Sequence, residues 1–104
     1  MPQTNIVVPQ EQIADFCRRW KISEFALFGS VLRQDFRSDS DIDVLVTFAP
    51  SARWGLFDLA TMQEELTQIF GRKVDLVSRR GVEASRNYMR RQAILNSAQV
   101  VHVA

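Results

Sequence analysis

Hydrophobic and polar positions in the first half of the chain predict a helix followed by two strands. Apolar residues recur at spacings of three and four between Pro9 and about Trp20, which predicts an amphipathic helix with proline in its first turn. The apolar run Phe25–Phe28 predicts a short strand that ends at Gly29. Ser30 can cap a helical turn over Val31–Gln34, and a polar loop then leads to a strand over Asp41–Phe48.

The second half of the chain predicts two more helices and two more strands. After a break at Pro50, a second amphipathic helix closes at Gly71 and is marked by Leu56, Leu59, Met62 or Gln63, Leu66, and Ile69 or Phe70. A strand over Lys73–Ser78 precedes a helix from about Val82 to Leu95, and the closing "QVVHV" predicts an edge strand. This order predicts an α/β (α+β) fold in which helices flank one small mixed β-sheet.

Length and composition are those of an ordinary globular domain. We expect a single domain over residues 1–104, since 46% of the residues are apolar and 24% are charged. No apolar run approaches the roughly 20 residues that span a membrane, and the N-terminus lacks the features of a signal peptide. Cys17 is the only cysteine and falls on an apolar helix face, so we expect core packing and a cytoplasmic location.

The net charge of +1 conceals a separation of charges. Seven basic residues but only two acids lie between Arg72 and Arg91, whereas four acids lie between Asp35 and Asp43. This separation suits a site that holds cations at one edge and receives anions or an acidic partner at another. A solvated helix face explains five of these basic residues equally well: Arg79, Arg80, Arg86, Arg90 and Arg91.

Two acids at the head of a strand are the most informative feature. Asp41 and Asp43 project from the same face of the predicted strand, about 6.5–7 Å apart along it. Two unpaired carboxylates held this close repel one another, and bound Mg²⁺ removes that conflict. Asp75 interrupts the apolar strand "KVDLV" and is the natural third ligand if the two strands are neighbours. The three acids therefore predict a two-metal site for phosphoryl chemistry.

A Gly-Ser turn upstream supplies a candidate phosphate site. Gly29 lets the backbone approach a phosphate, and the following turn presents free N–H groups. The hydroxyls of Ser30 and Ser40 can add hydrogen bonds to the same ligand. Arg33 can pair with a phosphate or lock the loop through Asp35. A plain strand-to-helix turn and a polar loop are the alternative reading, although Gly-Ser-x10-Asp-x-Asp arises by chance in only about one chain per thousand of this length.

The stretch "FGSVLRQDFRSDSDIDVLV" resembles the signature of polymerase-beta-type nucleotidyltransferases, and specifically of their minimal nucleotidyltransferase branch. The similarity continues through "GLFDLATMQEELTQIFGRKVDLVS" and covers nearly the whole chain. The resemblance implies the polymerase-beta-like fold, two Mg²⁺ ions and ATP. It also implies that Asp41 and Asp43 bind the metals, that Asp75 activates the attacking hydroxyl, and that Gly29 and Ser30 hold the triphosphate.

The resemblance further implies a partner. Members of this branch are commonly antitoxins of HEPN-domain ribonuclease toxins, in type VII toxin–antitoxin systems. Some transfer AMP from ATP to a tyrosine of the toxin. The resemblance also implies a hetero-oligomer of this chain with such a toxin.

Three functions compete. An enzyme that nucleotidylates a partner protein accounts for the intact carboxylates and Gly-Ser pair. A non-enzymatic antitoxin that acts by binding alone would tolerate their loss. Transfer to a small molecule or nucleic acid normally needs a further domain, for which 104 residues leave no room. Few aromatics lie among the arginines, which disfavours nucleic acid as a direct ligand.

The remaining aromatic and titratable residues indicate less. Trp54 and Phe57 could form a partner-facing or adenine-stacking patch, although we expect Phe57 to pack in the core at the start of its helix. His102 carries no expected role. Tyr88 is the only tyrosine, and nothing in the sequence supports its self-modification.

Overall fold

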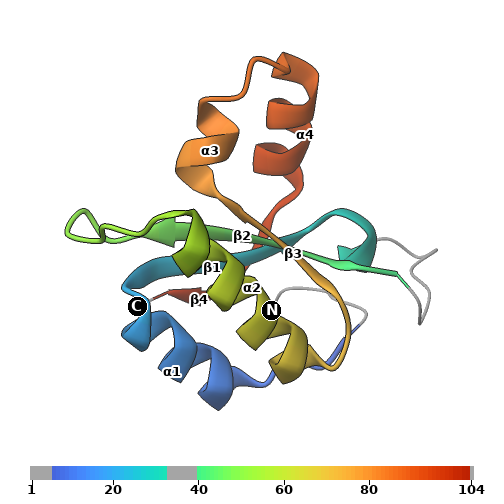
Figure 1. The fold of residues 1–104 in the computed structure, drawn as a ribbon. Coiled ribbons are helices and arrows are strands. Elements are labelled where there is room, and N and C mark those ends of the chain that lie inside the picture. Colours follow the sequence, from blue (N-terminus) through green and yellow to red (C-terminus); the bar gives the residue numbers. More distant parts are fainter. Residues whose placement is uncertain (1–5, 33–39, 104) are drawn as a thin grey trace.

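The structure is a computed structural model that describes residues 6–32 and 40–103 (Figure 1). Within these residues, helices and strands follow in the order α1 (Gln10–Arg19), β1 (Ile22–Phe28), the 3₁₀ turn η1 (Gly29–Leu32), β2 (Ile42–Phe48), α2 (Leu56–Phe70), β3 (Val74–Ser78), α3 (Arg79–Glu83), α4 (Tyr88–Ser97) and β4 (Gln99–Val103).

The described strands form one mixed sheet in the order β3-β2-β1-β4. β1 pairs antiparallel with both β2 and β4, whereas β2 and β3 run parallel. A parallel pair needs a crossover, and α2 provides it. The predicted mixed sheet with flanking helices is confirmed, as are the edge position of β4 and the expected neighbourhood of the strands that carry Asp43 and Asp75.

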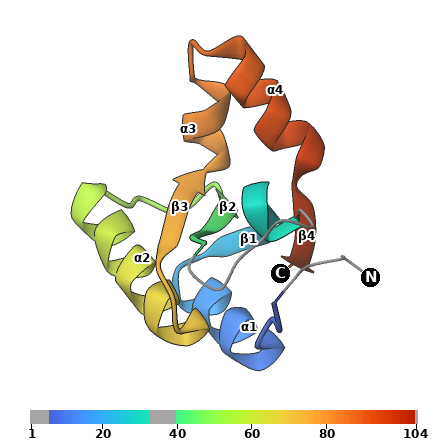
Figure 2. The ribbon, with the colours of Figure 1, turned by 90° about the vertical axis from the view of Figure 1, so that its right-hand side faces the viewer.

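Helices cover both faces of the sheet (Figures 1 and 2). α1 and α2 lie on one face, where alternate residues of β2 (Ile42, Val44 and Val46) join Phe16, Met62 and other buried side chains in the main core. On the other face, Leu45 packs with Val82 of α3 and Ile94 of α4 in a smaller cluster. Cys17 is buried in the main core as predicted, and burial raises the pKa of its thiol to about 12.

Two side chains of α2 cover the outer edge of β3. The Leu76 N–H donates to Gln63 Oε1 at 3.0 Å, and the Val74 N–H donates to Thr67 Oγ1 at 3.3 Å. An edge strand otherwise presents unpaired N–H groups that invite association with another chain. The helix therefore satisfies this edge as well as part of the core.

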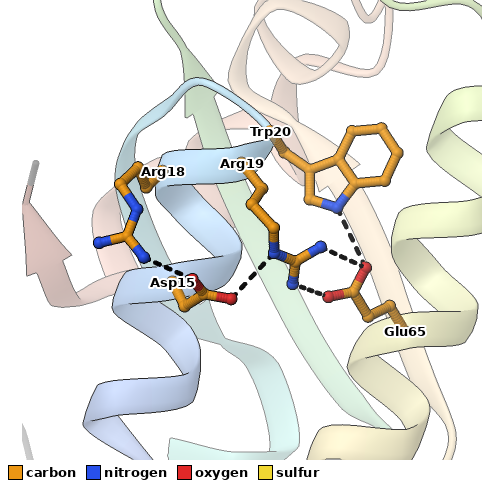
Figure 3. Close-up of polar contacts among 5 residues, drawn as sticks. All are labelled: Asp15, Arg18, Arg19, Trp20 and Glu65. Carbon is orange, nitrogen blue, oxygen red and sulfur yellow. Dashed lines mark hydrogen bonds and ion pairs between the residues drawn. The ribbon is translucent and has the colours of Figure 1, made fainter.

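A polar network ties α1 to α2 (Figure 3). Arg19 bridges Asp15 on its own helix and Glu65 on α2, and the Trp20 Nε1–H also donates to Glu65 at 3.2 Å. The hydrogen bonds from Arg19 are the largest influence on both carboxylates and lower the pKa of Asp15 and of Glu65. The network fixes the two helices side by side beneath the sheet.

One predicted helix is wrong as an unbroken element. The expected helix from Val82 to Leu95 is divided into α3 and α4 by a break at 84–87. The break is capped by hydrogen bonds: Asn87 Oδ1 accepts from the Arg90 N–H at 3.0 Å, and Arg91 donates to the carbonyls of Glu83 and Ser85. Asn87 is a favoured N-cap residue, so the local signal for a second helix start was present in "SRNYMRR".

Element ends differ elsewhere by a few residues. β1 begins at Ile22, three residues earlier than the apolar run predicted, because Ile22 and Glu24 continue the pairing with β2 across an irregularity at Ser23. Gly71 closes α2 with a φ of 72°, as expected for a left-handed C-cap. Within the part of the chain that the structure describes, every helix is too short or too polar to cross a membrane.

Candidate active site

Asp43 and Asp75 occupy facing positions on two neighbouring strands. They are register partners in the parallel pair of β2 and β3. Because side chains alternate along a strand, Asp43 lies on the same sheet face as Leu45, which is the face that carries α3 and α4. Asp43 is half-buried and Asp75 is exposed. The sheet thus brings together two of the three predicted carboxylates, with the outer one open to an incoming molecule.

Gly29 lies directly against Asp43. Phe28 pairs with Asp43 across β1 and β2, and the chain turns at Gly29 with a φ of 75°. A Cβ placed on Gly29 would lie 2.3 Å from Asp43 Oδ2, a separation that real Cβ atoms essentially never show. The position therefore needs glycine for two reasons, since its φ is also one that L side chains rarely adopt.

Asp41 directly precedes β2 and has a cationic neighbour that the sequence did not reveal. Its Oδ2 lies 3.8 Å from the Nζ of Lys73, which immediately precedes β3. The Ile42 N–H donates to the Lys73 carbonyl at 3.0 Å, so the backbone bond between the two strand starts holds these residues together. Both side chains are exposed, the one of Lys73 to 75% and the one of Asp41 to 48%. The pairing of strands, and not any local motif, produces this contact.

The predicted phosphate-binding residues lie around the same end of the sheet. Gly29 and Ser30 are the first two residues of η1, and half-buried Ser40 precedes Asp41. Arg33 lies outside the described residues, as does Asp35, its predicted alternative partner to a phosphate. Phosphate binding by Ser30, Arg33 and Ser40 stays a prediction.

The donor chemistry fits a hard divalent cation. Carboxylate oxygens are the ligands that Mg²⁺ prefers, and Asp43 and Asp75 present theirs from in-register positions. Asp41 lies two residues earlier, directly before β2, and its carboxylate is near the ammonium group of Lys73. As placed in residues 6–32 and 40–103, no three acidic, histidine or cysteine side chains converge closely enough to hold an ion. A site with three carboxylate ligands therefore requires movement of side chains.

The aromatic residues after Pro50 behave differently from the expectation. Phe57 is 92% exposed, so the predicted core packing is wrong, and Leu56 is 84% exposed. Both belong to the first turn of α2, whereas the buried residues of that helix, Met62 and Leu66, come later. Trp54 packs edge-on against Trp20, with ring centroids 5.1 Å apart, and its Nε1–H donates to the Trp20 carbonyl at 2.8 Å.

Four of the five arginines between Arg79 and Arg91 line two hollows at the far ends of β2 and β3, whereas Arg86 is exposed and lines neither. Arg90 and Arg91 line a cavity of about 220 Å³ between α3 and α4, and Arg91 lies 5.3 Å from the ring centre of exposed Tyr88. Arg79 and Arg80 line a groove of about 430 Å³ beside the loop that precedes α2. Neither hollow is lined by Asp41, Asp43 or Asp75.

A family model described as the nucleotidyltransferase domain matches residues 10–101. The chain belongs to this family. The match includes the Gly-Ser turn, the two strands that carry the acids, and all four helices described above. The fold and family expected from the motifs are thereby confirmed.

Individual nucleotidyltransferases resemble the chain in sequence and in structure. The protein adenylyltransferase MntA of Thermococcus cleftensis is 34% identical over 68 residues, which cover 64% of this chain and 65% of the relative. A solved structure of a candidate minimal nucleotidyltransferase is 33% identical, with a TM-score of 0.66 and coverage of 86% of each chain. A complex of a tri-AMPylated Shewanella oneidensis HEPN toxin with its MNT antitoxin has a TM-score of 0.60 at 18% identity, and covers 91% of this chain and 70% of that one.

The chain spans less than two thirds of the length of two further relatives. The chain spans 64% and 63% of the length of two Methanocaldococcus jannaschii relatives to which it is 33% and 30% identical. At 18% identity, the likeness to the toxin–antitoxin complex shows a shared fold.

Proposed function

We propose that this chain transfers AMP from ATP to a tyrosine hydroxyl of a HEPN-domain toxin and thereby acts as its antitoxin. The observation that carries the proposal is the facing pair Asp43 and Asp75 with Gly29 pressed against Asp43. The name of the archaeal relative and the AMP carried by the toxin of the structural neighbour support the same chemistry and the same class of partner.

In this proposal, Asp41, Asp43 and Asp75 hold two Mg²⁺ ions, which supply positive charge opposite the triphosphate. Gly29 and Ser30, with Ser40 and Arg33, hold the phosphate groups. The close approach of Gly29 to Asp43 fixes the distance between this turn and the acids. Holding both reactants in place then accounts for much of the rate acceleration.

The acceptor reaches the site from the side of Asp75. This carboxylate is exposed, whereas Asp43 is half-buried, so an incoming hydroxyl meets Asp75 first. The tyrosine oxygen attacks the α-phosphorus, its proton passes to the Asp75 carboxylate, and the bond from the α-phosphorus to the pyrophosphate oxygen breaks. The products are the AMP ester of the tyrosine and pyrophosphate. We place the reaction in the cytoplasm, where ATP and the toxin's RNA substrates are found.

The test is transfer in vitro. The chain is incubated with ATP, Mg²⁺ and the product of the neighbouring gene, and the intact masses of both proteins are measured. A gain of one or more AMP units on the partner, absent with Asp43→Asn, is the expected result. A stable complex without any mass gain would instead assign the chain to antitoxins that act by binding alone. Absence of both complex and mass gain would overturn the proposal.

A further inference from the structure

A groove at the end of the sheet opposite the acids is lined by several arginines, and exposed apolar residues lie next to its lining residues in the sequence. It lies between the loop that follows β2 and the start of α3, and its volume is about 430 Å³. Along β2, the five steps from Asp43 to Phe48 correspond to on the order of 16 Å. The groove is therefore separate from the candidate active site, and the proposed reaction makes no use of it.

The charge of the groove favours an acidic ligand. Arg53, Arg79 and Arg80 line it, with Glu83 as the one acid among its described lining residues, which leaves a surplus of two positive charges (three minus one). Arg79 lies 3.7 Å from Glu83, so Arg80 and Arg53 carry the surplus. Arg53 is held in place because its Nη1 donates to the carbonyls of Pro50 and Ala52 at 2.8 and 3.0 Å. A fixed guanidinium loses little side-chain entropy when a carboxylate binds.

Two large apolar residues lie next to groove-lining residues in the sequence. Leu56 and Phe57 stand between Trp54 and Leu59, which both line the groove, and they are 84% and 92% exposed. Nothing in the fold explains this exposure, because α2 takes its buried residues from later turns. Large exposed apolar residues beside charged ones are typical of protein–protein interfaces, where aromatic residues and arginine are enriched.

A protein segment suits this surface better than RNA. Stacking of bases needs several exposed aromatic faces, and Phe57 is the exposed one here. Trp54 packs against Trp20 and is only partly accessible. Carboxylates of a protein segment can pair with Arg53 and Arg80, while an apolar side chain covers Leu56 and Phe57.

We propose that this groove, lined by Arg53, Arg79 and Arg80, together with the exposed Leu56 and Phe57 next to it in the sequence, docks an acidic segment of the partner protein that also carries apolar side chains. The inference rests on the proposed function, since it concerns the partner whose tyrosine is modified. Docking at this end leaves the end with Asp43 and Asp75 open to the acceptor tyrosine. A partner held in this way is presented to the active site at high local concentration.

The experiment measures binding of the chain to the purified product of the neighbouring gene by isothermal titration calorimetry. Phe57→Ser and Arg80→Gln are each expected to weaken the complex by about tenfold or more. Val7→Ser and Arg18→Gln are matched controls. Val7, which precedes α1, is 90% exposed, and the side chain of Arg18 in α1 is 77% exposed. Both controls should leave the affinity unchanged.

The outcomes separate this inference from the proposed function. Unchanged affinity in Phe57→Ser and Arg80→Gln, with a tight wild-type complex, would overturn the docking groove and leave AMP transfer standing. Failure of the wild type to bind the partner would overturn the docking groove, and the proposed function falls with it only if no AMP is transferred either. The groove would be assigned to nucleic acid instead if a labelled single-stranded RNA binds the wild type but not Arg80→Gln, while the affinity for the partner is unchanged. ATP affinity, measured alongside, should be equal in all variants.

Discussion

A Cβ atom on Gly29 would lie 2.3 Å from Oδ2 of Asp43. The turn after β1 and the carboxylate on β2 are thus in contact, and any side chain at position 29 must displace one of them. Gly71 has nearly the same backbone conformation, with a φ of 72° against 75°, but nothing lies within 4 Å of its Cβ position. The two glycines therefore separate the cost of the backbone conformation from the cost of the close approach.

We predict that Gly29→Ala abolishes nucleotide transfer, whereas Gly71→Ala does not. Each substitution pays about 1–2 kcal/mol for an L residue in the left-handed region, but only Gly29→Ala also moves Asp43. Chemical denaturation measures the first effect and the AMP-transfer assay the second. Equal activity of the two variants would show that the contact between Gly29 and Asp43 has no role in catalysis.

Substitution of the two facing carboxylates, Asp43 and Asp75, should affect AMP transfer to different extents. Asp43→Asn removes a metal-binding charge and should abolish transfer with a stability near that of the wild type. Asp75→Asn removes the proposed proton acceptor from an exposed position and should lower kcat by about 10²–10⁴-fold. Binding of Mn²⁺ in the presence of ATP, followed by electron paramagnetic resonance, should weaken in both variants. Full activity of Asp43→Asn would contradict the metal assignment.

Lys73 should compete with divalent cations for Asp41. Exposed ion pairs of this kind are worth about 0.2–1 kcal/mol, so a divalent ion can displace the ammonium group easily. Lys73→Gln is expected to tighten Mn²⁺ binding in the absence of nucleotide by about two- to fivefold, and Lys73→Arg should restore the wild-type value. Weaker binding of Mn²⁺ by Lys73→Gln would mean that Lys73 supports the site instead of opposing metal entry.

The acids and the sheet were predictable because their signals are local. Alternation along Asp41–Phe48 placed Asp41 and Asp43 on one face, and an acid inside "KVDLV" identified Asp75. The register that sets Asp43 opposite Asp75 is long-range and depends on the crossover through α2. For the same reason the contact between Lys73 and Asp41 could not be foreseen, since it joins the starts of two strands that pair only in the folded sheet.

Two predictions were wrong where a local sequence pattern continues beyond the part of a helix that packs on the core or beyond the end of the helix. Leu56 matched the apolar period of α2, but the first turn of that helix reaches past the core, and Phe57 is exposed with it. The apolar and helix-forming residues after Val82 concealed the break at Asn87, where side-chain capping competes with helix continuation. In both places a local pattern is overridden by where the element meets the rest of the fold.

Gln63 should matter for stability although it is a polar surface residue of α2. Gln63→Ala leaves the N–H of Leu76 at the sheet edge without its side-chain acceptor, and we expect a loss of about 1–2 kcal/mol in the free energy of unfolding. Gln68→Ala on the same helix is the control, since Gln68 is exposed. Urea denaturation of both variants provides the measurement. Equal stabilities would show that water replaces Gln63 at this edge without cost.

The link between Arg19 and Glu65 should make stability depend on pH in acid. The hydrogen bonds from Arg19 lower the pKa of Glu65 in the folded protein below its ordinary value of 4.5. A lowered pKa adds stability that is fully present above the unfolded-state pKa and is lost as the pH falls through the folded-state pKa.

Glu65→Gln should therefore lower the free energy of unfolding by about 1 kcal/mol near pH 7 and by almost nothing well below pH 4. The value near pH 7 is kept small because Arg19 is partly exposed to solvent. Thermal unfolding between pH 7 and pH 3 measures this difference for the wild type and Glu65→Gln. Glu64→Gln is the control, since Glu64 is an exposed neighbour on the same helix. A gap between wild type and Glu65→Gln that stays constant across that range would show that Glu65 acts through packing and not through its charge.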